Sequence, residues 1–156
     1  MVRDTVSRPN ETPRSRRLAP AHLQAWPARM PAVSWPPQID EPLPRAEIAF
    51  GIRSKLVAYS LAPDHPAGGP KARGFAVVLG ITAEDVDHLV AEIEANLSAC
   101  RVSAIRANPP YGYLCEVRVP VRGLGDLRER RVEVVTSWEL LADDAAPRLV
   151  TAYIKG

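Results

Sequence analysis

The residues most able to do chemistry lie at positions 64–73, where the sequence reads DHPAGGPKAR. Gly68 and Gly69 permit close backbone approach, and a helix that begins just after them has unpaired amides at its start. Lys71 and Arg73 fall in that first turn, where a cation opposes the helix dipole by about 0.3–1 kcal/mol unless an anion is bound there. The pattern predicts a phosphate site. The alternative is that both cations are exposed and the small cost is tolerated.

His65, in the same stretch, is a candidate general acid or base, because the unperturbed pKa of histidine lies near neutrality. The alternative is a structural role, since a loop histidine beside Asp64 is more often a turn or capping residue. The other two histidines are weaker candidates. His22 lies in a proline-rich N-terminal segment and His88 on the polar side of a predicted helix.

A second row of polar groups is predicted in the last strand-like segment, residues 149–155. Strict alternation puts Thr151 on the same side of the strand as Tyr153 and Lys155, with Leu149 beside them and the intervening residues on the other side. A hydroxyl, a phenol and an ammonium in a row can hydrogen-bond a phosphodiester and stack a base. The alternative is a half-exposed strand made of good β-formers.

Three helices are predicted before these strands. Helical spacing of apolar residues covers 52–61, and a second helix runs over 70–79, with Pro70 at its first position and Gly80 as its stop. Thr82 is a candidate N-cap for the third helix. That helix carries an apolar stripe at 3.6-residue spacing, formed by Val86, Leu89, Val90, Ile93 and Leu97.

The C-terminal third of the chain alternates between apolar and polar residues, which is typical of strands. Strands are predicted over 115–122, 131–141 and 148–155, with a fourth, short one over 102–106. Pro120 cannot donate to a ladder, so its strand is expected at an edge or a bulge. Helices first and consecutive strands afterwards predict an α+β fold, with N-terminal helices packed on a C-terminal antiparallel β-meander of three to four strands.

Composition divides the chain near residue 45. Nine of the sixteen prolines lie in residues 1–44, where long apolar side chains are scarce, so this segment is predicted to be a flexible Pro/Arg-rich tail. Residues 1–45 carry seven arginines against four acids, whereas 46–156 carry thirteen basic and fourteen acidic residues. The predicted domain, 45–156, is therefore nearly neutral, and any anion site in it has to be local.

Targeting signals and metal ligands are not predicted. Ser15–Leu18 resembles the start of a twin-arginine signal, but the apolar stretch of about 7–15 residues that such a signal needs does not follow. No run approaches the roughly 18 apolar residues of a membrane span. Cys100 and Cys115 lack metal-ligand spacing and are best interpreted as buried, reduced thiols. We expect a cytoplasmic protein without membrane contact, metal or cofactor.

Two segments also resemble known bacterial domains. Residues 56–80 contain L-x-x-Y-x-L, then H-P-x-G-x-x-K-A-x-x-F and L-G, a pattern that resembles an uncharacterised bacterial domain family often encoded in toxin–antitoxin-like pairs. The ending from Trp138 through the segment 147–153 resembles the closing strands of the barnase/EndoU/colicin/RelE-like (BECR) ribonuclease toxins. Those domains place helices before an antiparallel sheet. The resemblance covers about 45–156 and leaves the tail unexplained.

The resemblance implies a toxin that cleaves RNA without a metal ion. The ribose 2′-hydroxyl would attack its own phosphate and leave a 2′,3′-cyclic phosphate and a 5′-hydroxyl. The family's loop histidine falls on His65, its helix-start lysine on Lys71 and its terminal-strand hydroxyl on Thr151. Phosphate binding is expected from four further residues: Gly68, Gly69, Arg73 and Tyr153.

The expected partners are an RNA substrate, with tRNA as a candidate, and a neutralising antitoxin or immunity protein. Two alternatives stay open at this point. One is a non-catalytic module that binds RNA or a partner protein through the same anion site. The other is the partner-binding half of a two-protein complex that docks through the arginine-rich tail.

Overall fold

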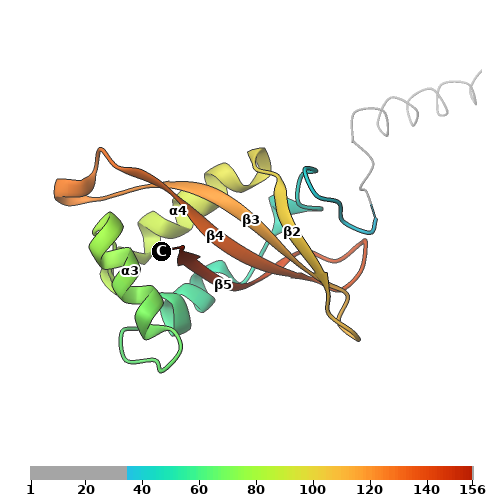
Figure 1. The fold of residues 1–156 in the computed structure, drawn as a ribbon, viewed down its shortest axis with the longest axis horizontal. Helices are drawn as coiled ribbons and strands as arrows, with labels where there is room; N and C mark the ends of the chain where they lie inside the picture. The colour runs from blue at the N-terminus through green and yellow to red at the C-terminus, as the bar shows by residue number, and fades with distance from the viewer. Residues whose placement is uncertain (1–34, 156) are drawn as a thin grey trace, which may run out of the picture. The chain divides into compact units, whose positions relative to one another are not determined.

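The computed structural model describes residues 35–155, which belong to one unit of the chain, Ser34–Gly156. Helices come first and a four-stranded antiparallel sheet follows, so the predicted α+β fold is confirmed (Figure 1). The helical segments are η2 (Ala46–Ile48), α2 (Ile52–Lys55), the π-turn η3 (Leu56–Ser60), α3 (Gly69–Leu79), η4 (Ala83–Asp85), α4 (Val86–Asn96) and η5 (Leu97–Ala99). The strands are β2 (Val102–Ala107), β3 (Tyr113–Arg122), β4 (Arg131–Leu140) and β5 (Arg148–Ile154), with a single turn, η6 (Gly125–Leu127), between β3 and β4.

The helix boundaries follow the predicted local signals. Pro70 lies at the start of α3, and Gly80 ends it in the left-handed region with φ 69°. At the next helix the backbone N–H of Thr82 donates to Asp85 Oδ2 at 2.9 Å, as in a capping box. Leu89 of α4 is fully buried, as its place in the apolar stripe predicts. Short-range chemistry therefore sets where each helix begins and ends.

The sheet is a simple meander in the order β2-β3-β4-β5, with every neighbouring pair antiparallel. β3 is thus an interior strand of the sheet. The predicted edge position of Pro120 holds only for the end of β3 that β2 does not reach. β2 reaches no further along β3 than Val117, so Pro120 lies where β3 has a strand partner on one side alone. The missing N–H of proline is tolerated there because no ladder bond is lost.

Side chains of α4 cover this uncovered stretch of β3. Asn96 donates to the carbonyl oxygen of Pro120 at 3.1 Å, and His88 Nε2 lies 2.7 Å from the carbonyl oxygen of Arg122. Glu92 accepts a 2.7 Å bond from the Arg122 backbone N–H. The three residues recur every four positions, so one face of the helix satisfies the strand edge. Their polar character reflects this contact with the strand.

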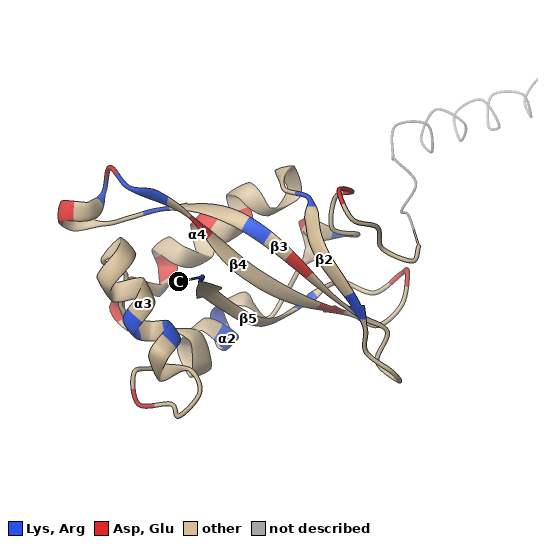
Figure 2. Cartoon of the chain, viewed as in Figure 1, with Lys and Arg blue, Asp and Glu red and all other residues tan. Residues whose placement is uncertain are grey.

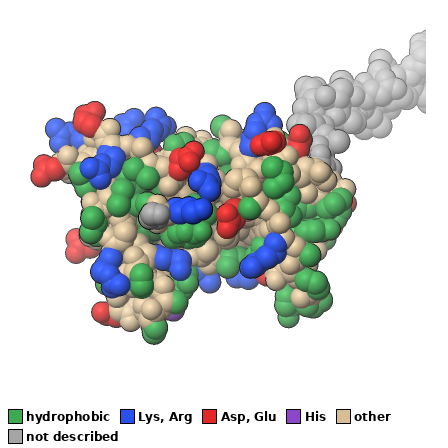
Figure 3. Space-filling model, viewed as in Figure 1, with side chains coloured by type: hydrophobic (Ala, Val, Ile, Leu, Met, Phe, Trp, Pro, Cys, Tyr) green, Lys and Arg blue, Asp and Glu red, His purple; other side chains and the backbone are tan. Residues whose placement is uncertain are grey.

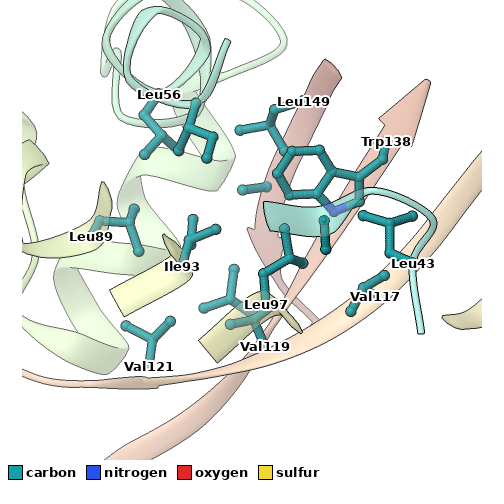
Figure 4. Close-up of a cluster of buried hydrophobic side chains, with 14 of the residues drawn as sticks. Leu43, Leu56, Leu89, Ile93, Leu97, Val117, Val119, Val121, Trp138 and Leu149 are labelled. Carbon is teal, nitrogen blue, oxygen red and sulfur yellow. The ribbon is translucent and has the colours of Figure 1, made fainter. Parts of the chain in front are cut away.

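One face of the sheet packs against the helices and forms the core, and Figure 1 shows α4 behind β3 and β4. We call it the covered face. Its largest side chain is Trp138, which Figure 4 shows among Leu43, Val117 and Leu149. The indole Nε1 donates to Thr136 Oγ1 at 2.8 Å, and that hydroxyl donates to the Val117 carbonyl at 2.7 Å. The buried polar atoms of this pair are therefore satisfied.

We call the opposite side of the sheet the open face. It carries half-buried and exposed side chains from all four strands, together with the buried Val135. The polar members of the open face on β3, β4 and β5 include Glu116, Arg118, Arg122, Arg131, Glu133, Ser137, Glu139, Arg148, Thr151 and Tyr153.

The predicted side-chain alternation in β5 needs a correction. Ser137 pairs with Thr151 while the next residue of β4, Trp138, pairs with Leu149, so Val150 is an extra residue in β5. Such a bulge shifts the alternation by one position. Leu149 consequently joins the core at 0% exposure, whereas Thr151 keeps the predicted side, together with Tyr153.

The predicted domain boundary after residue 44 lies too late in the chain. Leu43 is only 2% exposed and belongs to the core. Asp40 donates its N–H to the Val102 carbonyl at 2.9 Å, and Glu41 accepts from the Val102 N–H at 2.9 Å. Residues 40–43 are therefore part of the domain, held along the outer edge of β2. The rest of the predicted tail, residues 1–34, lies outside the described part of the chain.

Among the described residues, no helix has the length and apolar character needed to cross a bilayer.

Candidate functional site

His65 caps its own loop. Its Nδ1 accepts two backbone hydrogen bonds, from Ala67 N–H at 3.1 Å and from Gly68 N–H at 3.0 Å. A ring nitrogen that accepts carries no proton, so the proton of the neutral ring is on Nε2. Protonating Nδ1 would break both bonds. The structure supports the capping role that we held as the alternative, and it gives His65 no base nitrogen that faces a substrate.

The two glycines pack the loop against the chain itself. A Cβ on Gly68 would lie 2.0 Å from the Tyr59 carbonyl oxygen, and one on Gly69 would lie 2.8 Å from that of Pro63. Both residues are buried, and the Gly69 N–H donates to the His65 carbonyl at 2.7 Å. Because both amides have partners, neither Gly68 nor Gly69 offers a free backbone N–H to a phosphate. Their lack of a side chain serves local packing.

Lys71 lies between two tyrosines. Its Nζ donates to the Tyr59 hydroxyl at 3.1 Å and sits 4.9 Å from the centroid of that ring. The same Nζ is 5.8 Å from the centroid of Tyr153, at the end of β5. A depression of about 250 Å³ opens here, lined by Pro70, Lys71, Tyr153 and Ile154. The fold thus joins the predicted helix-start lysine to the predicted strand phenol.

Tyr59 is the centre of the arrangement, and our sequence analysis gave it no role. Its ring meets the His65 ring edge-on, with centroids 4.8 Å apart and planes at 89°. Lys55 Nζ lies 5.8 Å from the same ring. The available signal was helical spacing, because Lys55 and Tyr59 are four residues apart and share one face of the segment. Two ammonium groups and an imidazole therefore surround one phenol.

Thr151 and Arg73 are less closely tied to Lys71. Thr151 lies two residues before Tyr153 on the same face, about 7 Å away along the strand. Its Oγ1 is buried and has no hydrogen-bond partner among the described residues. The guanidinium of Arg73 folds back toward the start of α3, where Nη1 lies 3.6 Å from the position of a Cβ on Gly69. Arg73 is exposed, so it is available to an anion.

Neither cysteine belongs to this site. Both are free, and burial raises the pKa of the Cys115 thiol to about 11. Burial, assisted by the charge of Glu133, also raises the pKa of Cys100. Thiolates are the reactive form of cysteine, so both side chains are chemically quiet. Among the described residues, no group of three or more His, Cys, Asp or Glu side chains could hold a metal ion.

Comparison with known proteins gives one result. A family model described as "Domain of unknown function (DUF6883)" matches residues 42–156. The match begins beside Leu43, the first core residue that the structure describes. No curated protein and no solved structure matches the chain. The description of the family assigns no activity, so a function has to be argued from the residues around Lys71.

Proposed function

We propose that this chain, which belongs to the DUF6883 family, is a metal-independent ribonuclease that acts at the depression beside Lys71. The observation that carries the proposal is the ammonium of Lys71, bonded to the Tyr59 hydroxyl and flanked by the Tyr153 ring. A cation binds a phosphate, and the half-buried Tyr153 ring lines the depression, where it can stack a base. The depression, about 250 Å³, is smaller than the roughly 300–1,000 Å³ of small-molecule pockets. A depression of this size can hold one nucleotide of an RNA strand.

The proposed reaction is transesterification within RNA. The ribose 2′-oxygen forms a bond to the adjacent phosphorus while the bond from phosphorus to the 5′-oxygen breaks. The products are a 2′,3′-cyclic phosphate and a 5′-hydroxyl, and no water is consumed. Lys71 stabilises the negative charge that develops on the phosphoryl oxygens, an effect worth about 10²–10³-fold for one well-placed donor.

Tyr59 is the proposed proton donor. Its oxygen accepts from Lys71 Nζ, so its own hydroxyl hydrogen is left to protonate the departing 5′-oxygen. The proton of the 2′-hydroxyl leaves to solvent, and Tyr59 regains one from solvent after the products depart. General acid catalysis of this kind contributes about 10²–10⁴-fold. His65 is a positioning residue in this scheme, because its ring packs on Tyr59 and its Nδ1 fixes the loop.

A second candidate function is a non-catalytic module that binds RNA, or an acidic surface of a partner protein, through Lys71 and Tyr153. The bonding of His65 favours this alternative. An imidazole whose Nδ1 accepts two amides provides no general base, and the reaction then depends on charge stabilisation and one acid.

The test is cleavage of total tRNA and ribosomal RNA by the purified full-length chain in excess EDTA. We expect discrete fragments with cyclic phosphate ends, at least 100-fold slower formation with Lys71→Gln, and a similar loss with Tyr59→Phe. Arg53→Gln is the matched control, because Arg53 is an exposed arginine whose side chain pairs with Asp87 on α4. Circular dichroism would establish that each variant is folded. Intact RNA with folded wild type would exclude the ribonuclease and leave the binding module, which fluorescence anisotropy would detect.

A further inference from the structure

The hairpin of β3 and β4 extends past the end of β5. β5 pairs with β4 no further than Val134, and beyond that residue β3 and β4 form a two-stranded ribbon that Figure 1 shows projecting from the domain. A shallow depression of about 290 Å³ lies at its end. Its lining is almost entirely cationic and consists of Arg122, Arg128, Glu129, Arg130 and Arg131.

The pairing of two of these arginines costs stability. Arg122 of β3 and Arg131 of β4 are directly opposite in the ladder, and like charges at such positions are destabilising. Both side chains are exposed. Within residues 35–155, none of the four arginines in the depression has a carboxylate within 4.0 Å. A bound polyanion would turn this repulsion into attraction.

The ribbon shares the open face with the candidate site. Tyr153 pairs with Val135, and Val135 pairs with Arg118, so these three residues form a row across the sheet. Side chains on one face recur every second residue, about 7 Å apart, which places Arg122 and Arg131 on the same face as Arg118. Arg122 lies about 14 Å along β3 from Arg118. The open face therefore carries cations in the row containing Tyr153 and at the end of the ribbon, and the row between them consists of Pro120 and Glu133.

The positive charge is local to this hairpin. Residues 118–135 contain five arginines and three acids, a net charge of +2, whereas residues 35–155 contain fourteen basic and sixteen acidic side chains, a net charge of −2. Figure 2 shows Lys and Arg on β3 and around the turn between β3 and β4. The space-filling view in Figure 3 shows these cations at the surface. A polyanion is therefore drawn to the ribbon, because charge on the rest of the domain repels it.

We propose that the ribbon and the Arg118 side of the open face form a docking track for the phosphates of single-stranded RNA. This inference rests on the proposed function and extends it, because the track would lead a strand to Lys71 and Tyr153. A single strand fits better than a duplex, because only unpaired bases are free to stack on the Tyr153 ring at the end of the track. A track of this length holds about four nucleotides, at the small end of single-strand sites.

Affinity for an uncleavable strand tests the track directly. The probe is a fully 2′-O-methylated RNA decamer, measured by fluorescence anisotropy with the full-length chain at several salt concentrations. We expect about 3- to 10-fold weaker binding for Arg118→Gln, Arg122→Gln and Arg131→Gln singly. Each lost phosphate contact should lower the slope of log K against log salt by about 0.7. Arg53→Gln is again the control. Binding of the triple variant within twofold of wild type, or equal competition by a duplex decamer, would overturn the proposal.

Cleavage assays separate this proposal from the proposed function. A diribonucleoside monophosphate spans only the cleaved bond, so the triple variant should cleave it at the wild-type rate while kcat/KM for a decamer falls at least tenfold. If wild type cleaves neither substrate yet the triple variant loses decamer affinity, the ribonuclease fails and the track stands. If wild type cleaves both and the triple variant matches it on the decamer, the track fails and the ribonuclease stands.

Discussion

The two faces of the sheet use the same strands for different purposes. On the covered face, Cys115 and Trp138 are fully buried, and the indole N–H of Trp138 donates to the Thr136 hydroxyl. On the open face, Arg118 and Arg131 are exposed, and Arg131 stands opposite another arginine. The alternation of a strand lets one sequence place stability on one side and binding groups on the other. The like-charge pair of arginines, which lowers stability, lies on the open face and not on the covered face.

Two threonines make the contrast sharper. Thr136, on the covered face, accepts from the Trp138 indole and donates to the Val117 carbonyl. Thr151, on the open face, has a buried hydroxyl with no partner among the described residues. Folding alone does not favour an unpaired buried hydroxyl, because such a group costs about 1–3 kcal/mol. It lies two residues from Tyr153 on the same face of β5.

The largest expected effect tests the covered face. Trp138→Ala should lower the free energy of unfolding by about 3–5 kcal/mol, because it empties the centre of the core. Urea unfolding followed by circular dichroism measures this loss. Glu133→Ala, an exposed change on the same strand, should stay within about 0.5 kcal/mol of wild type. A loss below 1 kcal/mol for Trp138→Ala would mean that the covered face is not the core.

The next effect concerns the Cys115 thiol. Because its pKa is raised to about 11 by burial, its thiolate is more than 100-fold scarcer at pH 8 than that of an ordinary thiol with pKa about 8.5. Iodoacetamide should therefore modify Cys115 at least 100-fold more slowly in folded protein than in urea. The folded state holds this proton more tightly, so the thiol's contribution to stability is complete below pH 8.5 and is lost as pH rises toward 11. Rapid modification at pH 8 would contradict the burial.

Removing the hydroxyl of each threonine should change the free energy of unfolding by a smaller amount, and in different directions for Thr136 and Thr151. Thr136→Val should lower the free energy of unfolding by about 1–3 kcal/mol, since it leaves the Trp138 N–H unpaired. Thr151→Val should be neutral or slightly stabilising, because its hydroxyl has no bond to lose. Thermal unfolding of both variants side by side measures the contrast. Equal destabilisation would show that the two faces treat a buried hydroxyl alike.

The smallest expected effect is a gain in folding stability from a substitution on the open face. Arg131→Glu replaces a like-charge pair with an opposite-charge pair across from Arg122 and should stabilise the domain by about 0.2–1 kcal/mol. The same change should weaken binding of single-stranded RNA. Urea unfolding and anisotropy on one preparation measure both. A variant that is less stable than wild type would show that the arginine pair serves the fold.

Local patterns predicted the secondary structure well. The helix over 70–79, its Gly80 stop and the strand over 131–141 depend on spacing and capping within a few residues, and the structure reproduces them. The Val150 bulge was missed because it arises from pairing between β4 and β5. The role of Leu43 was missed because its proline-rich neighbours mask one core residue, whose partners lie far along the chain.

The residues of the candidate site were predicted from separate sequence patterns, and the structure shows which of them lie together. Lys71 and Tyr153 came from separate patterns, and the fold brings them together through contact between α3 and β5. The glycines at 68 and 69 have the composition of an anion-binding loop, but His65 and the chain itself take up their amides. Tyr59 was overlooked because a tyrosine on a helix is equally typical of packing. Sequence shows which groups are present, and only the fold shows which of them are already bonded.

The bonds that His88, Glu92 and Asn96 make to β3 have a consequence for assembly. An exposed strand edge is a template on which another chain can add a strand, and this is how many sheets dimerise or polymerise into fibrils. Along this stretch the backbone groups already have intramolecular partners. We therefore expect this stretch of β3 not to accept a strand from another chain.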